Sequence, residues 1–425
     1  MKTRVLAAAV IVALSVTIAA CGSSPKGGLT PSTGTLGSTT SPQDQGAGTV
    51  ASVTPQGTIL ADNGFRPNPN GFGFQNYGDN LSVDGSGGKP TNLTPAELQD
   101  IFGTQVCASG SGSSCQLIPT AQAWLQQENQ GMGGGHCFGF SVTALRFYDG
   151  NLKVSDFGSA PNAFGLSIPD NGQLQATIAR NFVGQSLPLE KQGTIQGTPN
   201  DVLNKLITTL KDKSEYYTIG IIKRDGGGGH AVTPYAVVDK GNGQKGILIY
   251  DNNFPGVSRQ ILVDTNADTW SYDGGPNPAD TNEHYEGDAT TKSMFLLPLN
   301  PIEQQNPCPF CNGENVSSSS AQTGSVLGAA QQYNQITLQG DPANHGHVVL
   351  TDKEGHQSGF INGKEVNDIP GVQIQTRFAN ADWAEAPEPV YDVPVKTDVN
   401  VTIDGTSLKR PDTETIDLIG PGDYN

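Results

Sequence analysis

The hydrophobic pattern of the chain changes near residue 215. Before this point apolar residues recur at helical spacing: Thr94 and Glu97 form a capping box before one such stretch, and Thr198 precedes another that runs to Leu210. After it, short apolar runs alternate with turns rich in Gly and Asn, which is typical of strands. This order predicts an α+β fold in which a helical half faces a β half.

The N-terminus reads as an export signal rather than as part of the fold. Lys2 and Arg4 precede an apolar run over residues 5–20, which is too short to span a membrane comfortably. Residues 21–58 are rich in Gly, Ser, Thr and Pro and contain hardly any apolar cluster, so we expect a flexible tether. The signal ends in Ile-Ala-Ala-Cys21 and resembles the lipobox of bacterial lipoproteins. That resemblance implies a lipid on Cys21 and a membrane-anchored, extracytoplasmic protein; the alternative is ordinary secretion after cleavage at the small Ala residues.

The charge balance argues against polyanionic partners. The chain has 24 Lys and Arg against 41 Asp and Glu, a formal net charge of −17. Nucleic-acid-binding proteins carry a basic patch or stripe, and the sequence shows none. We therefore expect no nucleic-acid partner, and contact with a membrane only through Cys21.

The six cysteines comprise two local pairs and two single residues, Cys21 and Cys137. Cys107 and Cys115 flank a flexible Gly/Ser loop, and Cys308 and Cys311 can close a tight loop of their own. Because paired thiols persist in an oxidising compartment, we predict two disulfides. Once Cys21 is assigned to a lipid, Cys137 remains as a free thiol.

Cys137 lies where a glycine-rich loop meets a helical pattern. Gly133, Gly134 and Gly135 precede it, and apolar residues at helical spacing follow it. The N–H groups at the start of a helix favour the thiolate, which is the reactive form of cysteine. The alternative is a small buried thiol in the core.

A second segment supplies the partners that a reactive thiol needs. His230 begins an apolar strand after a run of four glycines, and one hairpin later another strand ends in Asp251, Asn252 and Asn253. A thiol nucleophile requires a base, and the imidazole requires a third group that orients it. Any of these three residues could be the orienting group, with Asp251 favoured.

The segments around Cys137 and His230 resemble the papain-like cysteine peptidase superfamily. The residues that resemble the family's motifs are Gln130-Gly131, the run Gly-His-Cys-Phe-Gly-Phe-Ser at 135–141, and His-Ala-Val at 230–232. The resemblance implies that Cys137 is the nucleophile, that His230 is the general base and acid, and that Gln130 donates to the oxyanion. Gln130 lies seven residues before Cys137, one more than is usual, and the family's Asn-Ser-Trp sequence is absent.

The chain therefore divides into a papain-like domain over 59–300, including an N-terminal extension, a linker over 301–325 and a β-sandwich-like domain over 326–425. The last of these consists of short apolar runs separated by turn signals. It is expected to bind substrate, the cell envelope or a protein partner, or to pack on the enzyme domain. His345 and His347 share a strand face, but no third ligand is near them in the sequence, so no metal site is predicted.

The leading functional hypothesis is a lipid-anchored cysteine hydrolase that cleaves amide bonds, with peptide bonds favoured, and needs no cofactor. An amidase or transpeptidase would use the same residues. Two other hypotheses remain open. One is a non-catalytic binding or scaffold lipoprotein on a degenerate papain-like fold. The other is a thiol oxidoreductase that uses Cys308 and Cys311, although the prolines and glycines around this pair favour a loop and a structural disulfide.

Overall fold

The computed structural model describes residues 52–53, 56–82, 86–224, 228–274, 284–311, 333–341, 344–376, 378 and 388–420. The predicted signal at 1–20, the lipidated Cys21, most of the tether and the linker from residue 312 onward lie outside these residues. Within them, no helix is both long and apolar enough to cross a membrane. Residues 47–425 form one compact unit.

Most of the helices lie before residue 215, as the sequence predicts. They are α1 (Pro67–Asn70), α2 (Pro95–Phe102), α3 (Pro119–Gly131), α4 (Cys137–Asp149), α5 (Gly172–Phe182), α6 (Pro188–Gly193) and α7 (Pro199–Asp212). The capping boxes at Thr94 and Thr198 are both formed, which confirms the predicted starts of α2 and α7.

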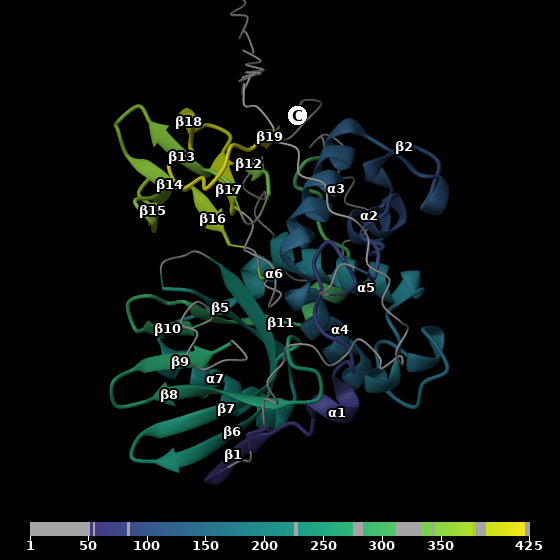
Figure 1. Ribbon diagram of the computed structural model, residues 1–425, viewed down its shortest axis with the longest axis vertical. Helices are drawn as coiled ribbons and strands as arrows, with labels where there is room; N and C mark the ends of the chain where they lie inside the picture. Colours follow the sequence, from purple (N-terminus) through teal and green to yellow (C-terminus); the bar gives the residue numbers. More distant parts are fainter. Residues whose placement is uncertain are drawn as a thin grey trace, which may run out of the picture. The chain divides into compact units, whose positions relative to one another are not determined.

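The β half is a nine-stranded antiparallel sheet (Figure 1). Its order is β10 (His284–Asp288), β9 (Thr269–Asp273), β8 (Ser258–Asp264), β7 (Gln244–Tyr250), β6 (Gly229–Gly241), β5 (Tyr217–Ile222), β11 (Met294–Pro298) and β4 (Ile195–Gln196), and β1 (Thr58–Asp62) pairs with β6 outside this path. A small hairpin of β2 (Cys107–Ser109) and β3 (Gln116–Leu117) lies apart from it. The mixed α+β fold class is thereby confirmed.

Side chains of the sheet alternate between two hydrophobic clusters. Leu248 and Tyr250 of β7 join the cluster that contains α4 and α5, whereas Ile247 and Ile249 join the cluster that contains α7. Because successive side chains of a strand point to opposite faces, helices cover both faces of this sheet. This packing explains why β6 and β7 read as nearly continuous apolar runs.

The C-terminal region contains two four-stranded antiparallel sheets, drawn in yellow-green in Figure 1. One has the order β16 (Gln373–Gln375), β17 (Val390–Pro394), β12 (Tyr333–Gln339) and β19 (Thr415–Ile419); the other has the order β15 (Lys364–Asn367), β14 (Gln357–Ile361), β13 (His347–Asp352) and β18 (Val399–Asp404). Residues of both sheets form one hydrophobic cluster. The sequence did not predict β14 and β15, although it did predict the Asn-Gly turn between them.

This region also contacts the helices. The Thr337 hydroxyl of β12 donates to Gln127 Oε1 of α3 at 3.3 Å, and Lys191 Nζ lies 3.0 Å from Asp392 Oδ2. Ile419 and Phe378 belong to the hydrophobic cluster of the helical half. The two predicted cysteine pairs, Cys107–Cys115 and Cys308–Cys311, each lie at disulfide distance, with Cα atoms 5.4 Å apart.

Candidate active site

Cys137 is the first residue of α4 and is a free, fully buried cysteine. The chain enters the helix through Gly135, whose φ of 130° strongly favours glycine, and through His136 at the N-cap. One turn later, a side chain at Gly139 would begin 2.2 Å from the Ile178 carbonyl oxygen. The glycines of this segment therefore allow α4 to start abruptly and to pack closely on α5.

His230 and Asp251 come together because β6 and β7 are antiparallel neighbours. His230 lies near the start of β6 and Asp251 directly follows β7, so both lie at the same end of the sheet. His230 Nε2 lies 2.8 Å from Asp251 Oδ1, and the side chains are 1% and 0% exposed. The backbone N–H of Ala231, next to His230, donates to Cys137 Sγ at 3.3 Å. The structure thus joins the three residues that the sequence singled out.

The charges of these groups support one another. Burial alone would lower the pKa of His230, but the charge of Asp251, the neighbouring Cys137 and the hydrogen bond to Asp251 raise that pKa well above its usual value. Burial opposes ionisation of Asp251, yet His230 and the hydrogen bonds from Tyr272 and the Asn253 N–H hold the pKa of Asp251 below its usual value. An imidazolium beside the Asp251 carboxylate is therefore the favoured protonation state of His230.

A neighbouring histidine provides a contrast. His136 is also fully buried, but burial lowers its pKa to about 4. Its Nδ1 lies 2.7 Å from the Tyr77 carbonyl oxygen, and its Nε2 lies 3.0 Å from Asn92 Oδ1. The neutral, hydrogen-bonded ring of His136 therefore positions the start of α4. Of these two histidines, His230 is the one with the charged neighbours that an acid and base needs.

The two asparagines after Asp251 have different contacts. Asn252 Nδ2 donates to the carbonyl oxygens of Cys137 and Ala231, at 3.1 and 2.9 Å, and thereby links α4 to β6. Asn253 donates its backbone N–H to Asp251 Oδ1 at 2.9 Å and accepts from Asn76. Of the three candidates for the orienting group, Asp251 is the one that bonds to the His230 ring.

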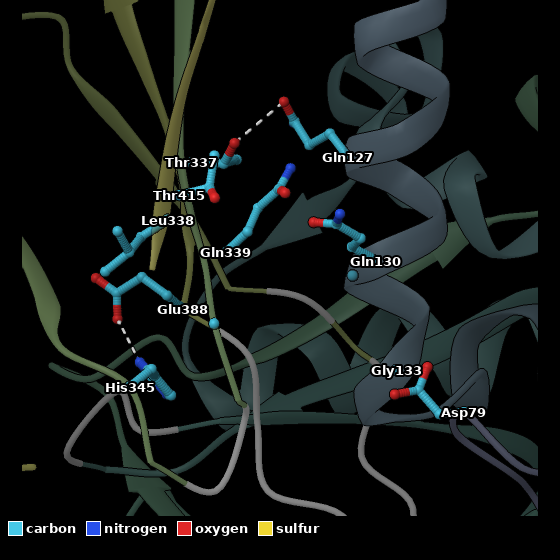
Figure 2. Close-up of a pocket in the computed structure, with 12 residues that line it drawn as sticks. Asp79, Gln127, Gln130, Gly133, Thr337, Leu338, Gln339, His345, Glu388 and Thr415 are labelled. Atoms are coloured by element: carbon cyan, nitrogen blue, oxygen red, sulfur yellow. Dashed lines mark hydrogen bonds and ion pairs between the residues drawn. The ribbon is translucent and has the colours of Figure 1, made fainter. Parts of the chain in front are cut away.

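Gln130 lies elsewhere in this arrangement. It belongs to the last turn of α3 and lines a cavity of about 300 Å³ together with Gln127, Gln339, His345 and Glu388 (Figure 2). Cys137 and His230 are not among the residues that line this cavity. The role of Gln130 as an oxyanion donor therefore stays a prediction.

Phe378 is a component of the site that sequence reasoning missed. Its carbonyl oxygen accepts from the N–H of Phe138 at 3.3 Å, and its own N–H donates to Gln185 Oε1 at 2.7 Å. It forms a parallel bridge with Gly229, the residue before His230, and is 7% exposed. The backbone of Phe378 thus lies between the segments that carry the thiol and the imidazole. No local pattern could have indicated this, because the contact joins residues more than 140 positions apart.

No family model, curated protein or solved structure matches this chain. The site is therefore defined by its geometry: a thiol at a helix start, an imidazole beside it and a buried carboxylate behind the imidazole. Such a set can form a thiolate–imidazolium pair, attack an electrophilic carbon and move a proton to a leaving group.

The cysteine pair and the histidine pair of the C-terminal part lie outside this site. Cys308 and Cys311 lie in a turn rather than at the start of a helix, and Phe310 between them packs on Phe102 and Trp124. This is the environment of a structural disulfide. The sequence offers no third ligand close to His345 and His347, but the structure brings Glu388, 41 residues after His347, beside both rings.

Proposed function

We propose that the chain is a cysteine hydrolase of the papain-like type that cleaves amide bonds, with peptides as its substrates. The observation that carries the proposal is the buried set Cys137, His230 and Asp251, in which the pKa of His230 is raised and that of Asp251 is lowered. The helical half carries the thiol and the sheet carries the other two residues, which is the division expected of a papain-like fold.

In the proposed reaction, Cys137 Sγ forms a bond with the substrate carbonyl carbon. The His230 proton moves to the leaving nitrogen as the C–N bond breaks, which leaves a thioester. His230 then takes a proton from water as the water oxygen attacks, and the acid product leaves as the thiolate re-forms. Asp251 holds the imidazole in place and stabilises its positive charge. The N–H of Phe138 at the start of α4, which donates to the Phe378 carbonyl oxygen in the structure, would donate to the oxyanion once Phe378 has left.

Phe378 supports a polypeptide substrate. Its backbone carbonyl oxygen accepts a hydrogen bond from the N–H of Phe138, one residue after the nucleophile, and its backbone pairs beside His230. A segment of polypeptide therefore already fits this position with its main-chain groups satisfied. Cys137 is 0% exposed, and we propose that Phe378, which contacts the residues next to Cys137 and His230, leaves when another chain binds.

The burial of Cys137 is also the observation that favours the alternative, a binding or scaffold protein on a degenerate papain-like fold. In that case the thiol is a core residue and the C-terminal sheets bind an envelope or protein partner. Under either proposal, the lipobox resemblance supports attachment through Cys21 at the extracytoplasmic face of the membrane.

Activity on a quenched fluorescent peptide library separates the proposals. The experiment uses the chain from residue 22 onward and its Cys137→Ala variant, with a Cys308→Ser/Cys311→Ser double variant as the matched cysteine control. Hydrolysis that falls at least about a thousandfold in Cys137→Ala and persists in the double variant is expected. Activity that survives Cys137→Ala, or a complete lack of hydrolysis even with Phe378→Ala, would overturn the proposal. Redox activity lost only in the double variant would favour the oxidoreductase hypothesis.

A further inference from the structure

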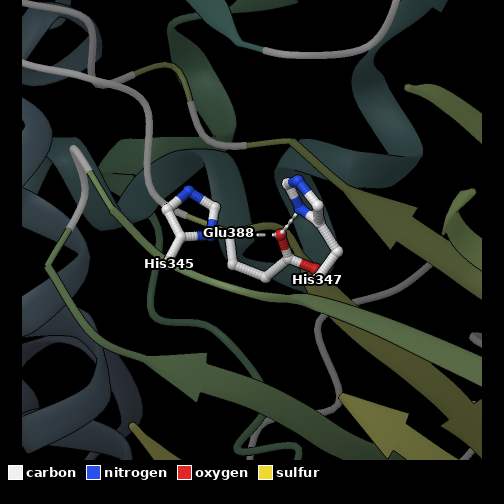
Figure 3. Close-up of side chains that lie close together, drawn as sticks. All are labelled: His345, His347 and Glu388. Carbon is white, nitrogen blue, oxygen red and sulfur yellow. Dashed lines mark hydrogen bonds and ion pairs between the residues drawn. The ribbon is translucent and has the colours of Figure 1, made fainter. Parts of the chain in front are cut away.

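Two histidines and a glutamate from two segments of the C-terminal region gather at the edge of the cavity that Gln130 lines. His347 begins β13, His345 precedes it by two residues, and Glu388 precedes β17. Figure 3 shows the Glu388 carboxylate between the two imidazole rings. Glu388 Oε2 lies 2.9 Å from His347 Nδ1 and 3.6 Å from His345 Nδ1, and one possible ligand atom from each residue lies within 4.8 Å of the others.

These separations match the requirements of a small divalent cation. Zinc bonds to nitrogen and oxygen of about 2.0–2.1 Å in a tetrahedral site place neighbouring ligand atoms roughly 3.3 Å apart. The distances of 2.9 and 3.6 Å from Glu388 Oε2 lie on either side of that value. Small side-chain rotations are then enough to close the site. One of them replaces the contact of His345 Nδ1 with the neighbouring Gly346 carbonyl, which measures 2.8 Å.

Hydrogen bonds from two neighbouring groups hold one oxygen of the Glu388 carboxylate in place. Its Oε1 accepts from the Val348 N–H at 2.7 Å and from the Tyr391 hydroxyl at 2.7 Å, and its side chain is 1% exposed. Oε2 is thereby aimed at the two histidines. Donors that fix the second oxygen of a ligating carboxylate are typical of protein metal sites, because they orient the ligand.

Access to the cluster comes from the cavity. His345 and Glu388 form part of its wall, across from Gln130 on α3 (Figure 2). The His345 and His347 side chains are 14% and 21% exposed, so a hydrated ion can reach them. Three protein ligands leave a fourth position of a tetrahedral ion open to this cavity, for water or a small anion.

We propose that His345, His347 and Glu388 form a binding site for a divalent transition-metal ion of the zinc class. Imidazole nitrogen and carboxylate oxygen are ligands that suit zinc. The ion would join β13 of one C-terminal sheet to the residue that precedes β17 of the other. It would thereby clamp the two sheets together and add stability in proportion to its binding.

The test is zinc binding by the folded chain from residue 22 onward, measured by equilibrium dialysis after chelator treatment. It is performed in the Cys137→Ala background, which removes the thiol as a competing ligand and makes the result independent of hydrolase activity. Glu388→Gln and His345→Asn are the site variants. His356→Asn is the matched control, because His356 pairs with Asp352 at 2.8 Å on the surface without a second histidine.

We expect one zinc ion per chain, bound at least about tenfold more weakly by each site variant and equally well by the control. Cobalt should give the visible spectrum of a tetrahedral nitrogen–oxygen site, and zinc should raise the melting temperatures of the parent and of His356→Asn but not those of the site variants. Should Glu388→Gln fail to fold, His345→Asn, whose ring is partly exposed, still decides. Absence of stoichiometric binding, or equal losses in the site variants and in His356→Asn, would mean that the cluster is an ion pair only.

Discussion

Two of the histidine–carboxylate clusters in the described part of the chain differ in their number of rings: one lies at the end of the large sheet and one between the C-terminal sheets. In the first, a single imidazole lies between Asp251 and a thiol, and burial is almost complete. In the second, two imidazoles share Glu388, and His345 and Glu388 line a cavity. One ring between a carboxylate and a thiol is suited to carry a proton, whereas two rings around one carboxylate present lone pairs to a cation. The two sites therefore differ in the number of imidazole rings and in how accessible those rings are to solvent.

The largest effect is expected from Asp251→Asn. The change leaves the shape of the side chain but removes the charge that raises the pKa of His230, so that pKa falls and the imidazolium is lost at neutral pH. Peptide hydrolysis should fall by about 10⁴-fold, as in other triads whose orienting acid is replaced. The measurement is kcat/KM on the best library peptide.

Asp352→Asn is the matched control for this change, since Asp352 pairs with His356 away from the thiol. It should leave hydrolysis within a factor of about two. A loss of similar size in both variants would contradict the distinction between the two kinds of cluster. Unchanged hydrolysis in Asp251→Asn would show that His230 does not depend on its carboxylate.

A smaller effect is expected from Phe378→Ala, which removes the ring that packs near Phe138 and Phe295. Burial of a phenylalanine ring stabilises a contact by about 1.5–3 kcal/mol, which corresponds to roughly 10- to 100-fold in an opening equilibrium. Alkylation of Cys137 by iodoacetamide should accelerate by that factor. Phe157→Ala, which removes a ring that packs on Phe147, should leave the rate unchanged. Equal rates in wild type and Phe378→Ala would mean that Phe378 does not control access.

The sequence carried enough information to predict the elements of the first site. Cys137, His230 and Asp251 each lie at the end of a helix or strand, and glycines or an apolar run mark each of those ends. Because antiparallel neighbours bring the start of β6 beside the end of β7, the pairing of His230 with Asp251 followed from a local hairpin. The capping boxes of α2 and α7 were readable for the same reason: their information is local.

The parts of the two sites that the sequence did not predict depend on contacts between distant segments. Phe378 and Glu388 have no distinguishing neighbours in the sequence, and each acts on residues of another element. Gln130 is a residue for which the position along the chain was misleading. Its position before Cys137 suggested a role at the thiol, but α3 turns its side chain toward the cavity with His345. Tertiary packing decides such cases, and spacing along the chain does not report it.

The central claim is that His230 activates Cys137, and the alkylation rate of Cys137 at pH 6 tests it most directly. The rate is compared in wild type and His230→Gln, each with and without Phe378→Ala, with folding checked by circular dichroism. At pH 6 His230 is protonated in the folded chain because its pKa is raised, so a thiolate–imidazolium pair should label at least about tenfold faster with His230 than without it. The two should converge near pH 9, where an ordinary thiol ionises. Equal rates at pH 6, or no labelling even with Phe378→Ala, would contradict an activated nucleophile and leave Cys137 as a core residue of a binding protein.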